Sequence, residues 1–309
     1  MRNTFATELV PLFEKKSDLV LYYADIGNRL FDPLKAIASD RVINVGIAEA
    51  NMASMAAGSS KLGLKPIIYT ITPFTTARNF EQIKIDIAYQ HEPVVIVGTG
   101  SGFSYANLGP THHSFEDIAL MRVLPNMQVV CPCDSNELKI LLNRAIASKN
   151  PTYLRIGKKN EPIITKLDKS LEIGKVNVIE SGSDIAILTT GTIIDLAAKL
   201  SESLKSQGVS TELVSIHSIK PLDEEYLSRM CRRFIRVIVL EEHSVIGGLG
   251  SAILEWMNSR GQYIPLSHFA IPDRFYDQVS SLASARVKAG LTLDRMLRNL
   301  KDDGIIIAR

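Results

Sequence analysis

Short apolar runs alternate along this chain with longer stretches in which apolar residues recur at helical spacing. The runs are rich in β-branched residues, which is typical of buried parallel strands. In the first half they predict strands at residues 19–24, 42–45, 65–70, 93–98, 127–130 and 153–156. Helices are predicted between them, at 48–58, 78–90, 115–122 and after the N-cap candidate Asp134, which has Glu137 three residues later. This alternation predicts an α/β fold, an open and mostly parallel sheet with helices on both faces.

The pattern changes between residues 157 and 182, where charges, prolines and glycines replace the regular periodicity. We interpret residues 161–182 as a linker. A second α/β unit follows, with strands predicted at 184–189, 211–216 and 235–240 and helices at 192–207, from 247 onwards and at 294–300. A length of 309 residues suits two domains of about 150 residues each. The predicted domains are therefore residues 1–160 and 183–309, each with its own sheet.

Composition excludes several classes of protein. The net charge is only +2, and lysines and arginines are scattered singly, so we expect neither a nucleic-acid partner nor an anionic membrane surface. No apolar run approaches the roughly 18 residues of a membrane span. Three cysteines without a metal-binding or redox spacing, and no N-terminal signal pattern, predict reduced thiols in a cytoplasmic protein.

Glu49 is the most informative single residue. The strand at 42–45 runs into Gly46, and a helix of small residues then carries Glu49 in its first turn. A glutamate at that position has a simple structural explanation, because the helix macrodipole favours it by about 0.3–1 kcal/mol. However, alanines surround this helix on almost every side, which predicts that it is buried, and a buried carboxylate needs a partner.

Two glycine-rich segments and a pair of histidines are further candidates. Residues 98–103 meet no phosphate-loop spacing and predict a flexible loop, whereas residues 247–250 open a helix, for which we favour close helix–sheet packing over anion binding. Neighbouring histidine side chains diverge, and no cysteine or carboxylate at ligand spacing accompanies His112 and His113, so no metal site is predicted. Their loop follows the strand at 93–98, where open α/β sheets bind ligands, and both histidines are candidate substrate contacts.

Several motifs together resemble the transketolase family of thiamine-diphosphate enzymes, which includes the deoxyxylulose-phosphate synthases. The resemblance covers almost the whole chain, and the motifs keep the family's order and spacing. They are Ala24-Asp-Ile-Gly27, Gly46-Ile-Ala-Glu49, Phe74 with Gln82-Ile83, Gly109-Pro-Thr-His112, Pro151-Thr-Tyr-Leu-Arg155, Ile219-Lys-Pro-Leu-Asp223 and Glu241-Glu-His243 with Gly247-Gly-Leu-Gly250. The resemblance implies a pyrimidine-binding domain followed by the family's C-terminal domain.

The resemblance also implies cofactor contacts. Glu49 would hydrogen-bond N1′ of the thiamine aminopyrimidine, so that the ring's exocyclic nitrogen can remove the thiazolium C2 proton. Phe74, or Phe80 as the alternative, would stack on the pyrimidine. Asp25 and Ile26 would touch the cofactor beside the thiazolium.

Substrate contacts follow in the same way. His112 would face the substrate and take part in catalysis, and Arg155 would bind the phosphate of a sugar phosphate with its planar guanidinium. Two polar positions of the family are changed, because Gly100 stands in place of a histidine and Leu108 in place of an aspartate. The chain therefore departs from the usual ketopentose-phosphate pattern.

The Gly-Asp-Gly motif with which the family holds Mg²⁺ and the diphosphate is missing from this sequence. We therefore expect the second subunit of a split transketolase, which transfers a two-carbon ketol unit between sugar phosphates. An N-terminal subunit would hold Mg²⁺ and the diphosphate, in an α₂β₂ complex, and the isolated chain would form a homodimer. The alternatives are the β subunit of a 2-oxoacid dehydrogenase E1, a deoxyxylulose-phosphate-synthase-like enzyme, and a non-catalytic paralogue.

Overall fold

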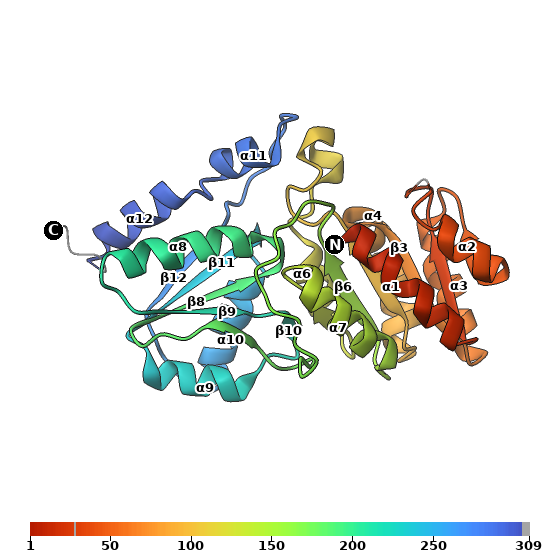
Figure 1. The fold of residues 1–309 in the computed structure, drawn as a ribbon, viewed down its shortest axis with the longest axis horizontal. Helices are drawn as coiled ribbons and strands as arrows, with labels where there is room; N and C mark the ends of the chain where they lie inside the picture. Colours follow the sequence, from red (N-terminus) through yellow and green to blue (C-terminus); the bar gives the residue numbers. More distant parts are fainter. Residues whose placement is uncertain (28, 305–309) are drawn as a thin grey trace.

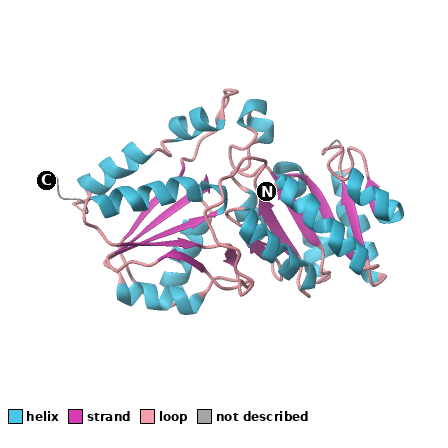
Figure 2. Cartoon of the chain, in the orientation of Figure 1, coloured by secondary structure: helices cyan, strands magenta, loops and turns pink. Residues whose placement is uncertain are grey.

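Two β-sheets lie side by side, each covered by helices (Figures 1 and 2). The computed structural model describes residues 1–27 and 29–304. The first sheet has seven strands in the order β10-β5-β6-β4-β3-β1-β2, and the second has five in the order β12-β11-β8-β9-β7. Among the described residues only two strand pairs are antiparallel, β10 with β5 and β7 with β9. The predicted fold class, two open and mostly parallel sheets, is confirmed.

The first domain matches the predicted strands closely. Its own strands are β1 (Leu19–Tyr23), β2 (Val42–Asn44), β3 (Lys65–Ile71), β4 (Val95–Thr99), β5 (Gln128–Val130) and β6 (Thr152–Ile156). Its longer helices are α1 (Arg2–Lys15), α2 (Asp32–Ala38), α3 (Glu49–Lys61), α6 (Asp117–Arg122) and α7 (Ser135–Ala147). Asp134 caps α7 as expected, because its side chain accepts hydrogen bonds from the backbone N–H groups of Asn136 and Glu137.

Helices cover both faces of the first sheet. On one face, α1, α2 and α7 bury a core around Leu21, Tyr69 and Val97. On the other face, α3, α6 and the π-helical stretch η2 (Ile83–Tyr89) bury a core around Tyr22, Ile68 and Ile96. The connection from β3 to η2 passes through two short helices, α4 (Thr72–Thr76) and α5 (Phe80–Gln82). The predicted helix at 78–90 is thus broken into shorter pieces.

The second domain repeats the arrangement on a smaller sheet. Its strands are β7 (Asn177–Glu180), β8 (Ile185–Thr190), β9 (Thr211–Ser215), β11 (Arg236–Ser244) and β12 (Leu266–Ile271). Helices α8 (Ile194–Ser206), α11 (Leu282–Ala289) and α12 (Leu293–Asp302) pack on one face. Helices α9 (Glu224–Arg233) and α10 (Leu249–Ser259) pack on the other. The last five residues of the predicted domain, 305–309, lie outside the described part of the chain.

The border between the domains differs from the prediction in two ways. The predicted linker at 161–182 contains β7, which pairs with β9 and so belongs to the second sheet. In addition, β10 (Ser218–Lys220) leaves the second domain and pairs with β5 of the first. Both strands are short and lie in charged or Pro-containing sequence, so their periodicity is too weak to reveal them. The sequence analysis also missed α1 and β12.

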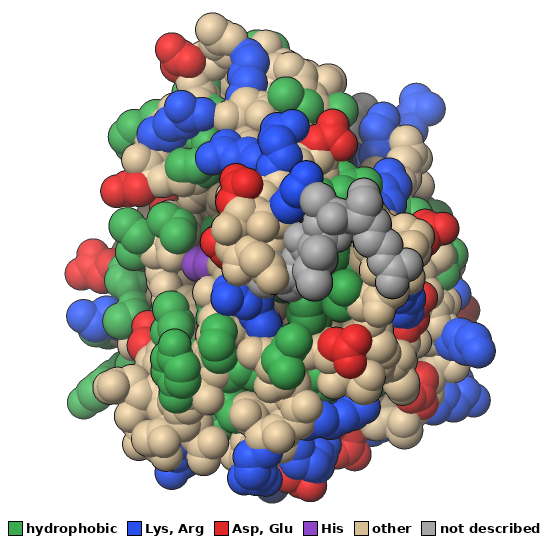
Figure 3. Space-filling model, turned by 90° about the vertical axis from the view of Figure 1, so that its left-hand side faces the viewer, with side chains coloured by type: hydrophobic (Ala, Val, Ile, Leu, Met, Phe, Trp, Pro, Cys, Tyr) green, Lys and Arg blue, Asp and Glu red, His purple; other side chains and the backbone are tan. Residues whose placement is uncertain are grey.

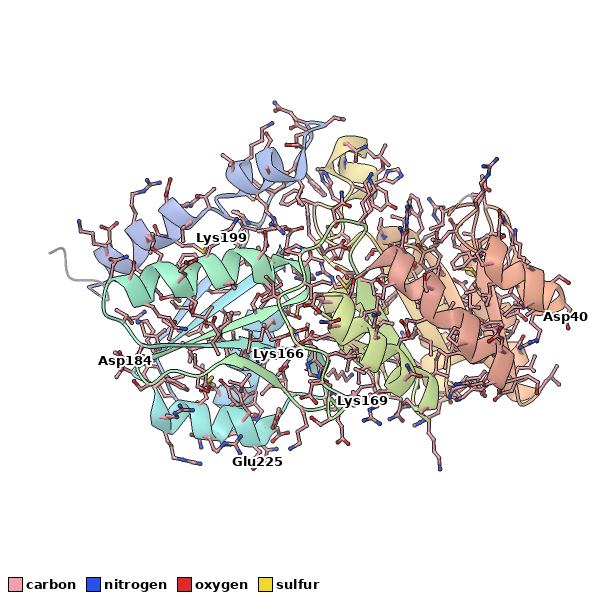
Figure 4. All side chains as sticks on the ribbon, viewed as in Figure 1. Asp40, Lys166, Lys169, Asp184, Lys199 and Glu225 are labelled. Carbon is pink, nitrogen blue, oxygen red and sulfur yellow. The ribbon has the colours of Figure 1, made fainter. Side chains whose placement is uncertain are left out.

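Charged side chains are dispersed over both domains. Figure 4 shows side chains of both signs that point outwards, among them Asp40, Lys166, Lys169, Asp184, Lys199 and Glu225. At the outer end of the second domain, near α12, basic and acidic groups are interspersed with apolar ones (Figure 3). None of the helices in the described part of the chain combines the length and the apolar character needed to cross a bilayer.

Candidate active site

The candidate site lies at the carboxyl edge of the first sheet. Neighbouring parallel strands β2, β1, β3, β4 and β6 all end at this edge, and the segments that follow them carry the predicted site residues. Open α/β sheets bind ligands at this edge because the strands deliver several loops to one place. The site therefore draws residues from sequence positions far apart.

Glu49 begins α3 and is buried, with 5% of its surface exposed. Its Oε1 atom accepts a hydrogen bond of 2.8 Å from Nη1 of Arg78, and Asn79 donates to its backbone carbonyl. Its other oxygen, Oε2, accepts no hydrogen bond from the described residues. The prediction of a buried, partnered carboxylate is confirmed. The partner, Arg78, was not singled out from the sequence because it lies 29 residues away.

Phe74 extends the cluster from α4. The Arg78 guanidinium lies over its ring at 4.1 Å, and its ring meets that of His112 edge-on at 5.2 Å between centroids. Phe80, the alternative stacking residue, packs instead against the core under α3. The structure thus brings Glu49, Arg78, Phe74 and His112 into one connected group.

His112 is oriented through one of its two ring nitrogens. Its Nδ1 atom lies 2.9 Å from the Thr111 hydroxyl, which leaves Nε2 for a ligand. Partial burial lowers the pKa of His112, and the nearby charges of Lys158 and Arg78 lower it further. The imidazole is therefore predominantly neutral near pH 7, and able to accept a proton.

Lys158 and Tyr105 complete this side of the site, and the sequence analysis missed both. The ammonium of Lys158 lies 3.9 Å from the centre of the Tyr105 ring, which is itself 6.1 Å from the His112 ring. The Tyr105 ring fills the space where a Cβ at Gly100 would lie, which explains why a side chain is absent there. Lys158 was recognisable only from its place just after β6, at the ligand-binding edge.

Asp25 and Ile26 lie at the same edge but outside this group. With Gly27 and Asn44 they line a neighbouring cavity of about 370 Å³ towards α2. The backbone N–H of Asp25 donates to the Gly46 carbonyl, which ties this segment to the one that carries Glu49. No hydrogen bond or ring contact among the described residues joins either side chain to Glu49 or Phe74.

His113 faces away from His112. Its ring packs against Phe103 at 5.4 Å and Phe115 at 5.1 Å, on the second-domain side of the loop. The sequence expectation that neighbouring histidines diverge is confirmed. His113 is therefore separated from the group around Glu49.

Arg155 lies in β6 and bonds with other groups of the protein. Its side chain is buried, and its Nε atom donates to Oδ2 of Asp117 at 2.6 Å. Its Nη2 atom donates to the Ser114 and Glu242 carbonyls. Its Nε and Nη2 atoms thus bond within the protein, whereas no hydrogen bond to Nη1 occurs among the described residues, and the phosphate contact of Arg155 stays a prediction. Arg155 also joins the two domains.

Helix α10 begins at Leu249, and a carboxylate of the protein itself lies at its start. Glu241 of β11 is buried and accepts hydrogen bonds from the backbone N–H groups of Leu249 and Gly250. Burial raises the pKa of Glu241, but the hydrogen bond from His268 and the nearby charges of His243 and His268 outweigh it and hold the pKa low. This carboxylate satisfies the helix start, so the expectation that no external anion binds there agrees with the geometry.

Comparison with known proteins then decides the family. Residues 1–162 match the family described as the transketolase pyrimidine-binding domain, and residues 174–294 match the transketolase C-terminal domain. The chain belongs to the transketolase family. Both domains of the structure correspond to domains of that family, as the motifs predicted.

Several relatives of this transketolase-family chain are themselves transketolase subunits. It is 32% identical to a 6-deoxy-6-sulfo-D-fructose transketolase subunit from Clostridium sp. (strain MSTE9), covering 96% of this chain and 92% of that one. It is 34% identical to an apulose-4-phosphate transketolase subunit from Actinobacillus succinogenes, covering 96% of each. A solved split-gene transketolase, an inactive β₄ tetramer, superimposes with a TM-score of 0.86 at 32% identity, covering 97% of this chain and 96% of that one. By contrast, the chain spans only 42% of a related deoxyxylulose-phosphate synthase from Shouchella clausii.

Membership of the transketolase family implies thiamine diphosphate, and the site fits part of that cofactor. Glu49 has a free carboxylate oxygen at the sheet edge, and Phe74 presents an aromatic ring beside it. No cluster of three or more metal-ligating side chains occurs among residues 1–27 and 29–304. The residues present therefore suit the pyrimidine end of the cofactor.

Proposed function

We propose that this chain is the pyrimidine-binding subunit of a two-chain transketolase-type transferase, which moves a two-carbon ketol unit from a ketose to an aldehyde. The observation that carries the proposal is the buried Glu49, with one oxygen held by Arg78 and the other free at the sheet edge. The relatives that are transketolase subunits support it.

Thiamine diphosphate, when bound, supplies the carbanion chemistry of the reaction. Glu49 would hold the aminopyrimidine through its free oxygen, and Phe74 would pack against the ring. Asp25 and Ile26 would touch the cofactor from the neighbouring cavity. Arg78 orients the Glu49 carboxylate, because it donates to Oε1 and is itself held over Phe74.

His112 would act on the substrate. In the tautomer whose Nδ1–H donates to the Thr111 hydroxyl, the neutral ring presents Nε2 as an acceptor for a substrate hydroxyl proton. A positioned histidine of this kind typically contributes about 10²–10⁴-fold to a rate. Among the substrate-binding residues predicted from sequence, His112 is the one that this geometry supports best.

The substrate class follows from the cation beside His112. With Arg155 withdrawn into the interior, Lys158 is the basic group that lies next to His112 and Tyr105. An ammonium binds an anionic group as a point charge, without the planar geometry that a guanidinium requires. We propose a sugar phosphate or a ketose with another terminal anion, consistent with the phosphate and sulfonate in the names of the relatives' substrates.

A separate N-terminal subunit would hold Mg²⁺ and the diphosphate, in an α₂β₂ complex. Apolar residues just outside the two ends of α3, Ile47 and Leu62, and Tyr89 at the end of η2 are exposed, which suits burial against another subunit. The isolated chain would self-associate, as the β₄ form of the related structure illustrates. It would neither turn over a substrate nor bind thiamine diphosphate tightly.

The test is reconstitution. The purified chain is titrated with thiamine diphosphate and Mg²⁺, alone and with a co-expressed diphosphate-binding subunit. We expect tight binding, and transfer from a ketose phosphate to an aldose phosphate, only with the partner. Micromolar binding by the chain alone would overturn the two-chain site, and a reconstituted complex that accepts pyruvate as donor would identify a deoxyxylulose-phosphate-synthase activity instead.

A further inference from the structure

A second cavity lies behind the loop that carries His112, on the side to which His113 turns. It has a volume of about 320 Å³, which is at the lower end of the range of about 300–1,000 Å³ usual for small-molecule sites. The first domain contributes Phe103 and His113, and the second contributes the segment 274–288. In Figure 1 the first part of this segment, which leads into α11, reaches over to the loop that follows β4. The backbone N–H of Ser280 donates to the Ala106 carbonyl and fixes the two walls together.

Buried polar atoms without partners line this cavity. His113 is 7% exposed, and neither of its ring nitrogens has a hydrogen-bond partner among the described residues. The hydroxyl of Tyr276, another lining residue, is likewise buried and unpartnered within that part of the chain. Buried polar groups are nearly always hydrogen-bonded, so three such atoms around one cavity require partners, which water or a ligand in the cavity supplies. Burial and the neighbouring His112 lower the pKa of His113, and a neutral imidazole offers one donor and one acceptor, which suits hydroxyl groups.

The rim of the cavity is basic. Arg274 and Lys288 line it, against one acidic lining residue, Asp277. Neither basic side chain forms an ion pair with a carboxylate in the described part of the chain. Arg274 is nevertheless held in place, because its guanidinium lies over the Tyr276 ring at 5.0 Å and donates to the Lys288 carbonyl at 2.6 Å. Two cations without carboxylate partners are suited to an anion.

We infer that this cavity is a second binding site, distinct from the one around Glu49, for a small hydroxylated organic anion such as a polyol phosphate. The anionic group lies between Arg274 and Lys288, and hydroxyl groups of the ligand reach His113 and Tyr276. Phe103 and the exposed ring of Phe275 contact its carbon skeleton. Because His112 and His113 point to opposite sides of one loop, the ligand occupies this site without displacing a ligand at His112.

The test uses the full chain labelled with ¹³C at histidine Cε1. Sorbitol 6-phosphate is the probe, since it has no carbonyl group and is neither donor nor acceptor in ketol transfer. Sorbitol and inorganic phosphate are titrated separately. The chain has six histidines, and spectra of His112→Gln and His113→Gln assign the two signals. If His113→Gln does not fold, the single substitutions of the other five histidines assign its signal by elimination.

We expect a saturable shift of the His113 signal with sorbitol 6-phosphate, and a smaller shift with sorbitol alone or with inorganic phosphate alone. The double variant Arg274→Gln/Lys288→Gln should weaken the affinity by about tenfold or more, because it removes two charge-assisted contacts. The matched control Arg229→Gln/Lys205→Gln, on exposed helices of the same domain, should bind as the parent does. In the complex with the partner subunit, saturation with thiamine diphosphate should leave the shift in place.

Three results would overturn the inference. The first is a His113 signal that does not move with the probe at concentrations that saturate a millimolar site. The second is a shift that inorganic phosphate reproduces fully, or that persists undiminished in the Arg274→Gln/Lys288→Gln variant. The third is displacement of sorbitol 6-phosphate from the cavity, either when thiamine diphosphate is added or when the chain assembles with a partner subunit that fills the cavity itself. The first two are distinguishable from a failure of the proposed transferase activity, because they are read on the isolated chain.

Discussion

Two arginine–carboxylate pairs in the first domain have the same chemistry and opposite surroundings. Arg78 binds Glu49 at 2.8 Å, and Arg155 binds Asp117 at 2.6 Å. The Arg78 side chain is 44% exposed, whereas both side chains of the Arg155 pair are 1% exposed. The first pair leaves one carboxylate oxygen free at the sheet edge, whereas the second is closed by Tyr153 and by backbone carbonyls.

The difference separates a pair that is available for a ligand from one that is committed to the fold. A buried pair offsets its desolvation only when further hydrogen bonds satisfy its remaining atoms, and the Arg155 pair has those bonds. In the first pair only Arg78 reaches solvent, since the Glu49 side chain is 6% exposed, and one Glu49 oxygen remains free to bind something else. An arginine in the sequence therefore does not by itself identify a residue that binds phosphate, because the surroundings of its side chain decide whether it is available.

The largest expected effect concerns the closed pair. Arg155→Met should lower the free energy of unfolding by about 3–5 kcal/mol, because it leaves the Asp117 carboxylate buried and unpaired. The matched change Arg78→Met should cost less, because Oε2 of Glu49 stays free at the sheet edge, whereas further protein groups enclose Asp117. Urea denaturation of both variants measures the contrast. Equal losses would show that the two environments differ less than the structure indicates.

The same pair gives a pH dependence with a defined sign. Burial alone would raise the pKa of Asp117, but attraction to Arg155 outweighs it and the pKa lies below its usual value. A carboxyl with a lowered folded-state pKa contributes stability that is complete above its ordinary pKa and is lost as the pH falls through the lowered one. The extra stability of the parent over the double variant Asp117→Leu/Arg155→Met should therefore decrease in acid. Urea denaturation of both proteins at a series of acidic pH values measures the change, and a pH-independent difference would contradict it.

The next effect concerns the open pair and is catalytic. In the complex with the partner subunit, Glu49→Gln should slow exchange of the thiazolium C2 proton of bound thiamine diphosphate by about 10²–10⁴-fold. Its melting temperature should hardly change. The control is Glu81→Gln, an exposed glutamate in the first turn of α5. If Glu49→Gln instead melts several degrees lower and exchanges normally, Glu49 is only a residue at a helix start.

A smaller effect is expected at Arg78. Arg78→Gln should weaken thiamine diphosphate binding by about two- to fivefold, since it removes the ion pair that orients Glu49 but leaves the carboxylate itself in place. Arg78→Lys should retain part of the affinity, because the charge stays but the placement over Phe74 is lost. Fluorescence titration of the assembled complex measures both. An Arg78→Gln complex that binds as tightly as the parent would show that Arg78 does not orient Glu49.

The smallest effect is a change in one pKa. Lys158→Gln should raise the pKa of His112, because the lysine charge contributes to keeping it low. The ring would then be protonated to a greater extent at a fixed pH near 7. Titration of the labelled histidine by NMR measures the change, with Lys159→Gln as the neighbouring control. A His112 pKa that moves equally in both variants would reflect net charge and not proximity.

The sequence predicted the fold better than the site. Strands such as 65–70 and 93–98 are short, mostly apolar segments that helices bury on both faces, so the sequence pattern identifies them as strands. Strands β7 and β10 were missed because short edge strands bury few side chains and carry little pattern. Helix α1 was missed for a similar reason, since polar residues and Pro11 interrupt its apolar positions.

Glu49 was recognisable because the first turns of its helix are rich in alanine, which makes a charge there conspicuous. The burial of Arg155 was not recognisable from the sequence, although all five residues of its strand β6 are buried in the structure. Its partner, Asp117, lies 38 residues away on α6, and only the tertiary structure brings the two together. The role of Arg78 depends in the same way on a contact across the fold.

Strand β10 limits where such a gene can be divided. It crosses from the second domain to form the edge of the first sheet, beside β5. A break in the reading frame near residue 160 would produce a first domain whose β5 has an unpaired edge, and exposed edges of this kind promote aggregation. Strand β10 thus makes the two domains one structural unit, although each has its own sheet.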